Sequence, residues 1–184
     1  PLAYQLGRKL ATQLESQALP DALESEQETI DMGEHVIIVG YGRVGQTVGK
    51  LLAEEHINYV ALDLEPAMVT KAREKGLPAY YGDGARREVL NAVSVKRARA
   101  AVVTVNDFAA ANKAVVALRA ISRGLPIIAR TSDIGQLRLL EQSGADIAVS
   151  EKFEAGLQLG GALMKTLGVA DLEISRVLEV FRAG

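Results

Sequence analysis

From residue 36 onward, short apolar segments rich in β-branched residues alternate six times with helical stretches. The apolar segments predict strands at Val36–Val39, Tyr59–Leu62, Ala79–Tyr81, Ala101–Val105, Ile127–Ala129 and Ile147–Val149. The helical stretches lie near residues 43–55, 66–75, 86–92, 108–122, 134–142 and 153–167. Strands that are apolar on both sides are typical of a parallel sheet buried between helices. The alternation therefore predicts an α/β fold, a doubly wound six-stranded parallel sheet with helices on both faces.

Residues suited to turns and helix ends stand between these segments. Pro66 stands at an expected first helical turn, and Asp107 and Asp133 stand where helix N-caps are expected. A glycine falls between a predicted helix and the next strand at Gly76, Gly124 and Gly144. Because glycine accepts a left-handed backbone at low cost, we expect that conformation after each of these helices.

The charge distribution separates residues 1–34 from the rest of the chain. This segment holds seven acidic and two basic residues, a net charge of −5, against −2 for all 184 residues. Residues 1–20 predict a modest helix ended by Pro20, and residues 21–34 predict an acidic linker. The segment is either a disordered leader or a connector from an upstream domain. The chain begins with Pro1 rather than Met, so we expect it to be part of a longer protein.

Composition excludes several classes of function. The chain has no Cys, which excludes disulfide scaffolds, Cys-ligated zinc and cysteine nucleophiles. Aromatic residues make up 4% of the chain, and the net charge is near zero. Both observations argue against nucleic-acid binding. No apolar run approaches the length of about 20 residues that a membrane helix needs.

A glycine-rich turn carries the chemistry. It reads Gly40-Tyr41-Gly42-Arg43-Val44-Gly45, directly after the first predicted strand and at the start of a helix. In this context Gly40 allows a tight turn, Gly42 lets a phosphate approach the backbone, and Gly45 lets the helix pack closely. The helix N-terminus offers N–H groups to the phosphate. The predicted fold is therefore Rossmann-like and binds a nucleotide.

An acidic residue completes this pattern. Asp63 ends the second strand, 18 residues after Gly45. A carboxylate at this place accepts hydrogen bonds from ribose hydroxyls and repels a 2′-phosphate, which favours NAD or an adenine mononucleotide over NADP. The alternative is that the glycines serve packing only and that Asp63 caps a helix.

Further polar residues follow the other strands, where ligands of open α/β sheets bind. Gly82, Asp83 and Gly84 follow the third strand, and residues 104–107 follow the fourth. Arg130 follows the fifth strand, where it either meets an anionic group or pairs with Glu151. Each of these residues can also serve only as a turn former or cap.

The sequence shows no evident set of catalytic residues. His35 precedes the first strand and His56 precedes the second, so both fall at the opposite edge of the sheet. We identify no catalytic residue and no metal site, and we expect a binding module rather than an enzyme. The alternatives are a small NAD-dependent oxidoreductase and a free-standing regulatory subunit. Gly156, Gly160 and Gly161 lie in the last predicted helix, where they serve either packing within the chain or a subunit interface.

Several segments in register resemble one known family. They are Val36-Ile-Ile-Val-Gly-Tyr-Gly-Arg-Val-Gly-Gln46, Asp63, Tyr81-Gly-Asp83, Ile127-Ile-Ala-Arg-Thr-Ser-Asp133, Gly144-Ala-Asp146, Phe153-Glu154 and Val180-Phe181-Arg182. They resemble the regulator of K⁺ conductance/K⁺ transport nucleotide-binding (RCK/KTN, TrkA-N) domain, in the form found at the C-terminus of Kef-type potassium/proton antiporters and their plastid relatives. The resemblance covers about 35–182.

This resemblance implies a gating domain on the cytoplasmic side of a membrane. It implies binding of NAD(H) or AMP, a homodimer formed through the last helices, and a transmembrane antiporter domain in the full-length chain. The implied organisation is a linker at 1–34, the regulatory domain at 35–170 and a C-terminal tail at 171–184. The implied contacts with the nucleotide are Gly40, Tyr41, Gly42, Arg43, Val44, Gly45, Asp63, Leu64, Gly82, Asp83, Thr104, Asn106, Asp107 and Arg130.

Some members of this family are also held shut by glutathione, which the resemblance places beside Arg130. Ser150 and Gly161 stand where we expect those members to carry basic residues. The sequence therefore favours control by a nucleotide and leaves glutathione open.

Overall fold

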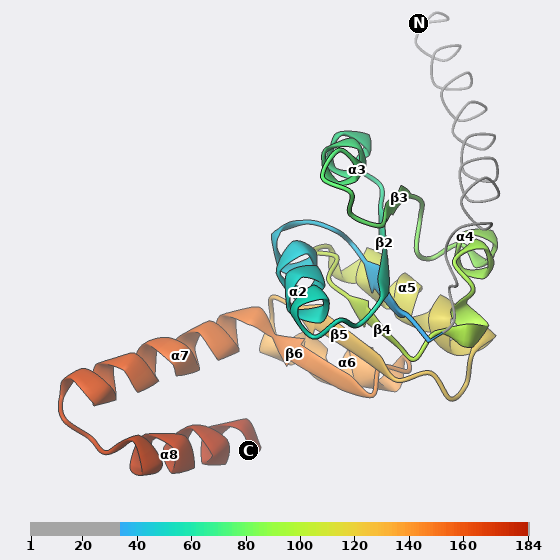
Figure 1. The fold of residues 1–184 in the computed structure, drawn as a ribbon. Coiled ribbons are helices and arrows are strands. Elements are labelled where there is room, and N and C mark those ends of the chain that lie inside the picture. The colour runs from blue at the N-terminus through green and yellow to red at the C-terminus, as the bar shows by residue number, and fades with distance from the viewer. Residues whose placement is uncertain (1–33, 184) are drawn as a thin grey trace, which may run out of the picture.

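The computed structural model describes residues 34–183 (Figure 1). The predicted helix at 1–20 and nearly all of the acidic linker at 21–34 lie outside this part of the chain. Six strands form one sheet, in the order β3-β2-β1-β4-β5-β6, and every neighbouring pair is parallel. The strands are β1 (Val36–Val39), β2 (Tyr59–Asp63), β3 (Ala79–Tyr81), β4 (Ala100–Val103), β5 (Ile127–Thr131) and β6 (Ile147–Ser150). The predicted doubly wound, Rossmann-like sheet is confirmed.

Helices connect the strands and cover both faces of the sheet (Figure 1). They are α2 (Arg43–Glu54), α3 (Pro66–Arg73), α4 (Arg87–Ala92), α5 (Phe108–Ile121), α6 (Leu137–Gln142), α7 (Glu151–Thr166) and α8 (Asp171–Ala183). Two short 3₁₀ helices are η1 (Val95–Arg97) and η2 (Ile134–Gln136). The stretch predicted as a C-terminal tail thus forms a helix, α8.

The core is divided between the two faces by the alternation of side chains along each strand. Ile37 and Val39 of β1 belong to the larger cluster, which α4, α5 and α6 cover. Ile38, between them, belongs to the smaller cluster under α2 and α3. All three side chains are buried, because β1 lies in the middle of the sheet.

Most of the predicted helix ends are confirmed. Pro66 stands in the first turn of α3, and Asp107 caps α5 by accepting a hydrogen bond from the N–H of Ala110 at 2.8 Å. Asp133 caps η2 through the N–H of Gly135 at 2.9 Å. Gly76 and Gly144 have positive φ, as expected.

The prediction for Gly124 is wrong, because this glycine does not adopt a left-handed backbone. The guanidinium of Arg119 satisfies the carbonyl groups beyond α5 instead. Its Nη1 donates to the carbonyl of Arg123 at 2.6 Å and to that of Leu125 at 2.9 Å, while its Nε donates to the carbonyl of Gly144 at 3.0 Å. A side chain from the last turn of α5 thus fixes the connection to β5 without a left-handed residue at position 124.

Arg119 also pairs with Asp146, just before β6. Oδ2 of Asp146 accepts from the N–H of Ile127 at 2.7 Å and from Nη2 of Arg119 at 2.8 Å. The bond from Ile127, and then that from Arg119, hold the pKa of this carboxyl below its usual value of 3.8, although partial burial opposes them. A lowered pKa in the folded state means that the contribution to stability is complete above pH 3.8 and is lost as the pH falls further.

An Asp146→Asn substitution tests this pH dependence of the free energy of unfolding. The variant should be less stable than the parent at pH 7, by about 0.5 kcal/mol, since the side chain is 55% exposed and water screens the pair. The difference in the free energy of unfolding should shrink below pH 3.8, as the parent carboxyl becomes protonated. Urea unfolding at pH 7, 5 and 3 measures it. In an Arg119→Met background, Asp146→Asn should lower the free energy of unfolding by less than it does in the parent. A loss of stability that is the same at all three pH values would contradict a lowered pKa for Asp146.

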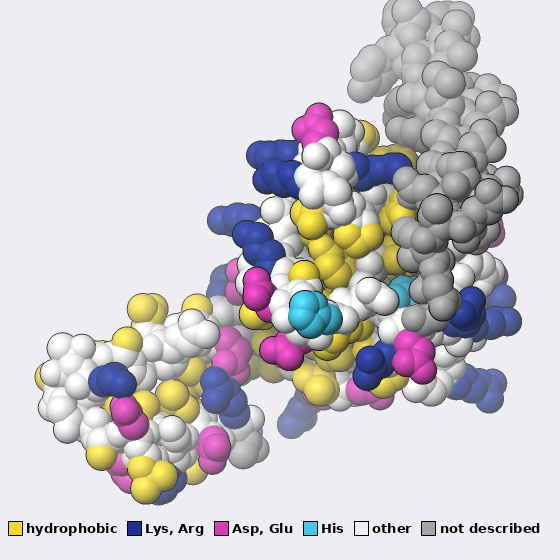
Figure 2. Space-filling model, viewed as in Figure 1, with side chains coloured by type: hydrophobic (Ala, Val, Ile, Leu, Met, Phe, Trp, Pro, Cys, Tyr) yellow, Lys and Arg dark blue, Asp and Glu magenta, His cyan; other side chains and the backbone are white. Residues whose placement is uncertain are grey.

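The last two helices form an arm that extends from the sheet, with α8 folded back beside α7 (Figure 1). Ion pairs join α7 to α8 near both ends of this arm, Arg182 with Glu154 at 2.8 Å and Lys165 with Asp171 at 3.1 Å. Few of its side chains are buried, and hydrophobic side chains are visible on its surface (Figure 2). The large exposed ones are Leu159, Leu163, Leu167, Leu172, Val180 and Phe181. Among residues 34–183, no helix combines the length and the apolar character needed to cross a membrane.

Candidate nucleotide-binding site

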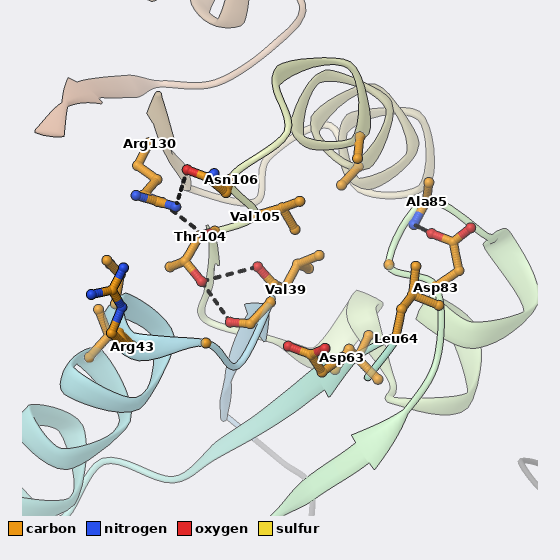
Figure 3. A pocket seen from close by; sticks show the side chains of 18 of the residues that line it. Val39, Arg43, Asp63, Leu64, Asp83, Ala85, Thr104, Val105, Asn106 and Arg130 are labelled. Atoms are coloured by element: carbon orange, nitrogen blue, oxygen red, sulfur yellow. Dashed lines mark hydrogen bonds between the residues drawn. The ribbon is translucent and has the colours of Figure 1, made fainter. Parts of the chain in front are cut away.

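A pocket of about 680 Å³ opens where the strands of the sheet end (Figure 3). Its lining comes from the carboxyl ends of β1 and β2, from the residues that follow β3 and β4, and from the first two turns of α2 and α5. Arg130 of β5 and Glu151 of α7 complete one side. The chain steps outward from β1 to β2 and β3 on one side, and from β4 to β5 and β6 on the other. Open α/β sheets bind ligands at such a reversal, which here lies between β1 and β4.

The glycine turn between β1 and α2 has three differently constrained positions. Gly40 has a φ of +92°, which favours glycine. A Cβ on Gly45 would lie 2.1 Å from the carbonyl oxygen of Gly40, so α2 packs on this turn only because residue 45 is glycine. A Cβ on Gly42 would meet no atom within 4 Å. The protein itself leaves space at Gly42, and that space is part of the pocket lining.

The start of α2 presents backbone donors to this space. Gly42 is the N-cap residue, no side chain caps the helix, and no acidic residue stands in its first turn. The N–H groups of a helix start have no acceptor within the helix, and the helix dipole places partial positive charge there. The arrangement is suited to an anionic group such as a phosphate.

Asp63 holds this turn against the end of β2. Its Oδ2 accepts from the N–H of Tyr41 at 2.5 Å, and its Oδ1 accepts from the N–H of Glu65 at 2.8 Å. Each carboxylate oxygen has two lone pairs, so each retains one for another donor. Asp63 therefore serves as a local turn former and can also accept hydrogen bonds from a ligand in the pocket.

The structure brings eleven of the fourteen predicted contact residues to the pocket lining. These residues are Gly40, Gly42, Arg43, Val44, Asp63, Leu64, Gly82, Asp83, Thr104, Asn106 and Arg130. The other three are Tyr41, Gly45 and Asp107, which do not line it. Nucleotide contact remains a prediction for all fourteen.

Each of these three residues has another place in the structure. Asp107 caps α5, and Gly45 packs against Gly40. Tyr41 is buried in the smaller core cluster under α2 and α3, and its hydroxyl lies 2.8 Å from that of Tyr59. Burial, and then the bond with Tyr59, raise the pKa of the Tyr41 hydroxyl above its usual range.

Three further lining residues, Gly84, Val105 and Glu151, were placed at this edge of the sheet by the sequence but were not among the predicted contacts. Sequence reasoning missed the other residues of the lining, which are Val39, Thr47, Val48, Leu62, Ala85, Ala110 and Ala114. A signal was available for two groups of them. Thr47 lies one helical turn after Arg43, and Ala110 and Ala114 share a face of α5, so helical spacing from the predicted turns indicates these side chains.

Arg130 is held by three partners. Its Nε donates to the carbonyl oxygen of Thr104 at 2.8 Å, its Nη2 donates to Oδ1 of Asn106 at 3.0 Å, and its Nη1 forms an ion pair with Glu151 (Figure 3 shows the first two). Of the two readings of Arg130 from the sequence, pairing with Glu151 is the one that the structure contains. A guanidinium has five N–H donors, so donors remain for a ligand.

Thr104 links Arg130 to the glycine turn. The Thr104 hydroxyl donates to the carbonyl oxygen of Gly40 at 2.6 Å, and its N–H donates to the carbonyl of Val39 at 2.8 Å. One hydrogen-bonded chain therefore runs from Gly40 through Thr104 and Arg130 to Glu151, the first residue of α7.

The two histidines lie at the opposite edge of the sheet, as predicted. His35 precedes β1, is buried, and donates from Nε2 to the carbonyl of Val93 at 2.9 Å. His56 lies in the turn before β2 with a φ of +54°. Within the described part of the chain, no group of His, Asp or Glu side chains is arranged to hold a metal ion.

A family model and two curated relatives are similar to this chain. The family model of the TrkA-N domain matches residues 36–151. The chain is 34% identical over 190 residues to K(+) efflux antiporter 3, chloroplastic, of Arabidopsis thaliana, covering 99% of this chain and 24% of that protein. It is 30% identical over 183 residues to a glutathione-regulated potassium-efflux system protein of Haemophilus influenzae. That alignment covers 99% of this chain and 30% of the Haemophilus influenzae protein. The chain thus spans less than a third of the length of these relatives.

A solved structure has the same fold. The Shewanella denitrificans Kef CTD, in its AMP-bound form, superposes with a TM-score of 0.70 at 28% sequence identity. The match covers 82% of this chain and 91% of the other. The structural similarity therefore extends beyond residues 36–151, which the TrkA-N family model matches.

Proposed function

This chain belongs to the TrkA-N domain family, and on that premise we propose that it is the nucleotide-binding regulatory domain of a potassium/proton antiporter. In this role it senses NAD(H) or AMP and controls potassium efflux. The similarity to potassium-efflux proteins supports the transport setting. One observation carries the binding function: the uncapped start of α2, the open space at Gly42 and the carboxylate of Asp63 all border one pocket.

The chemistry of this pocket favours an adenine nucleotide with a free ribose. The start of α2 and Arg43 suit the phosphate, and the unused lone pairs of Asp63 suit the ribose hydroxyls. Leu64 and Val105 offer apolar surface to a base. The AMP-bound state of the Shewanella denitrificans relative supports this assignment. The Asp63 carboxylate would repel a 2′-phosphate, so NADPH should bind poorly.

The remaining assignments follow from the same role. Residues 35–170 form the regulatory domain, residues 1–34 connect it to a transmembrane antiporter domain, and the domain lies on the cytoplasmic side of that membrane. Two copies associate through the arm of α7 and α8, whose exposed leucines otherwise face water. Gating requires that the nucleotide bind one state of this assembly more tightly than the other. A glutathione site beside Arg130 is not part of this proposal.

Calorimetric titration of the purified domain with AMP, NAD⁺, NADH, NADPH and glutathione tests the proposal. We expect heat of binding with AMP or NADH and none with NADPH. Light scattering at the same concentrations should give twice the mass of one chain. A domain that binds no nucleotide would overturn the proposal.

A Gly42→Ala substitution separates binding from folding. The backbone of Gly42, with φ −67°, accepts alanine, and the added methyl meets no protein atom within 4 Å. We expect stability to change by less than about 1 kcal/mol. AMP affinity should fall about tenfold, because the methyl prevents close approach of the phosphate to the start of α2. Thermal unfolding and calorimetry measure the two effects.

A matched control is Gly124→Ala, between α5 and β5 and outside both the pocket and the arm, where the added methyl also meets no atom. This variant should keep its AMP affinity. In the full-length transporter, Gly42→Ala should remove the dependence of potassium efflux on the nucleotide. Unchanged AMP affinity in Gly42→Ala would place the ligand elsewhere.

A further inference from the structure

The arm is attached to the sheet by a small number of contacts at its first turn. α7 follows β6 directly, and the Ser150 hydroxyl accepts a hydrogen bond from the N–H of Phe153 at 3.4 Å. Beyond this turn, the only buried residue of α7 is Gly161, which packs against Ile174 and Leu178 of α8. The ion pairs of Glu154 and Lys165 join α7 to α8 and do not involve the sheet. The direction of the arm therefore depends on how its first turn is held.

Glu151 holds this turn to the pocket. It is the first residue of α7, its side chain is 51% exposed, and it pairs with Arg130, whose side chain is 15% exposed. Both residues line the pocket. The guanidinium that anchors the arm is thus accessible to an anionic ligand in the pocket, through the donors that Thr104, Asn106 and Glu151 leave unused.

We infer that the Arg130–Glu151 ion pair couples occupancy of the pocket to the position of the α7–α8 arm. A phosphate in the pocket attracts Arg130 and competes with Glu151, and loss of the ion pair frees the first turn of α7. The hydrogen bonds from the Thr104 hydroxyl to Gly40 and from Arg130 to the Thr104 carbonyl keep Arg130 in place while its partner changes. Arg130 is here a positioning residue that acts on the arm through Glu151. This inference rests on the proposed function, because it takes a nucleotide as the ligand.

If nucleotide binding weakens the Arg130–Glu151 ion pair, then the ion pair weakens nucleotide binding by the same factor. The inference therefore predicts the direction in which AMP affinity changes when the ion pair is removed. If the nucleotide must displace Glu151, then removing the carboxylate removes that cost. Glu151→Gln should therefore raise AMP affinity about fivefold, the lower end of typical coupling between sites. Simple repulsion between the carboxylate and the phosphate would also raise the affinity. The two causes separate in an Arg130→Met background, where Glu151→Gln should no longer raise the affinity if competition for Arg130 is the cause.

The position of the arm is measured directly by a distance between two spin labels. The chain has no Cys, so Lys96→Cys and Gln158→Cys, both at exposed positions, give one label on the body and one on α7. Labelled chains are diluted with unlabelled ones, so that only distances within a chain contribute. At saturating AMP, with saturation verified by calorimetry, we expect the distance distribution to shift in the parent. Glu151→Gln should show the shifted distribution without AMP and no further change with it.

Glu154→Gln is the matched control, one turn along the same helix. It breaks a pair with Arg182 of α8 and leaves Arg130 untouched, so the AMP-dependent shift should persist. A shift that persists in Glu151→Gln, or an affinity gain that survives in Arg130→Met, would overturn the inference. Binding of AMP to the parent without any change in distance would overturn this inference alone. Failure of the parent to bind any nucleotide would overturn the proposed function as well.

Discussion

Asp63→Ala should weaken AMP binding by about 10- to 150-fold, which corresponds to about 1.5–3 kcal/mol. The carboxylate ends β2 at the pocket, and each of its oxygens is engaged by one backbone N–H, from Tyr41 and from Glu65. The remaining lone pairs can accept from the two ribose hydroxyls, and hydrogen bonds to a charged acceptor are stronger than neutral ones. Calorimetric titration of the variant with AMP measures the loss.

The same substitution also removes two hydrogen bonds that shape the turn, so a second ligand is needed. An AMP analogue that lacks both ribose hydroxyls should bind the parent more weakly than AMP does. In Asp63→Ala the two ligands should bind nearly alike. Asp133→Ala is a matched control, since it removes a carboxylate that bonds a backbone N–H outside the pocket. If the variant still discriminated between the two ligands as the parent does, Asp63 would not contact the ribose.

Gly45→Ala should destabilise the domain by about 3 kcal/mol, at the upper end of the cost of overpacking. The added Cβ would lie 2.1 Å from the carbonyl oxygen of Gly40 and 3.0 Å from the Thr104 hydroxyl oxygen. The first of these is a backbone atom of the turn, so α2 must move away from β1. Urea unfolding measures the loss, and AMP affinity should fall in the same variant because the turn itself is displaced.

Gly49→Ala provides the comparison one turn further along α2. Its Cβ would approach the Tyr59 ring and the Tyr41 hydroxyl at 3.0–3.1 Å, contacts that small movements of side chains relieve. We expect a smaller loss of stability than for Gly45→Ala, with AMP affinity retained. Equal losses in the two variants would refute the special role of the contact between Gly45 and Gly40.

The fold could be predicted from the sequence because the alternation of apolar segments with helical stretches is repeated six times. Five of the six strands begin where the apolar segments begin, and the glycine turn lies between β1 and α2 as expected. The predicted strand at 101–105 was too long at its end, because Thr104 and Val105 already belong to the pocket. The helix α8 was missed although Ile174, Val177, Leu178 and Phe181 have helical spacing.

The candidate site could be predicted only in part, for reasons of geometry. Gly40 and Gly42 border the pocket, but the Tyr41 side chain between them is buried in the core with Ile38 and Tyr59, which the sequence of the turn does not indicate. The hydrogen bonds of Arg119 reach residues as distant in sequence as Gly144, which no local pattern indicates. The pairing of Arg130 with Glu151 was an open alternative from the sequence, and only the structure joins it to Thr104 and Gly40.

The central place of β1 has a consequence for synthesis on the ribosome. β1 pairs with β2 on one side, but on the other side Val36 pairs with Ala100, which is translated 64 residues later. At about 5–20 residues per second, a nascent chain carries one unpaired edge of this central strand for about 3–13 seconds. Unpaired strand edges are templates for association with other chains. The nascent chain is therefore open to such association between the synthesis of β1 and that of β4.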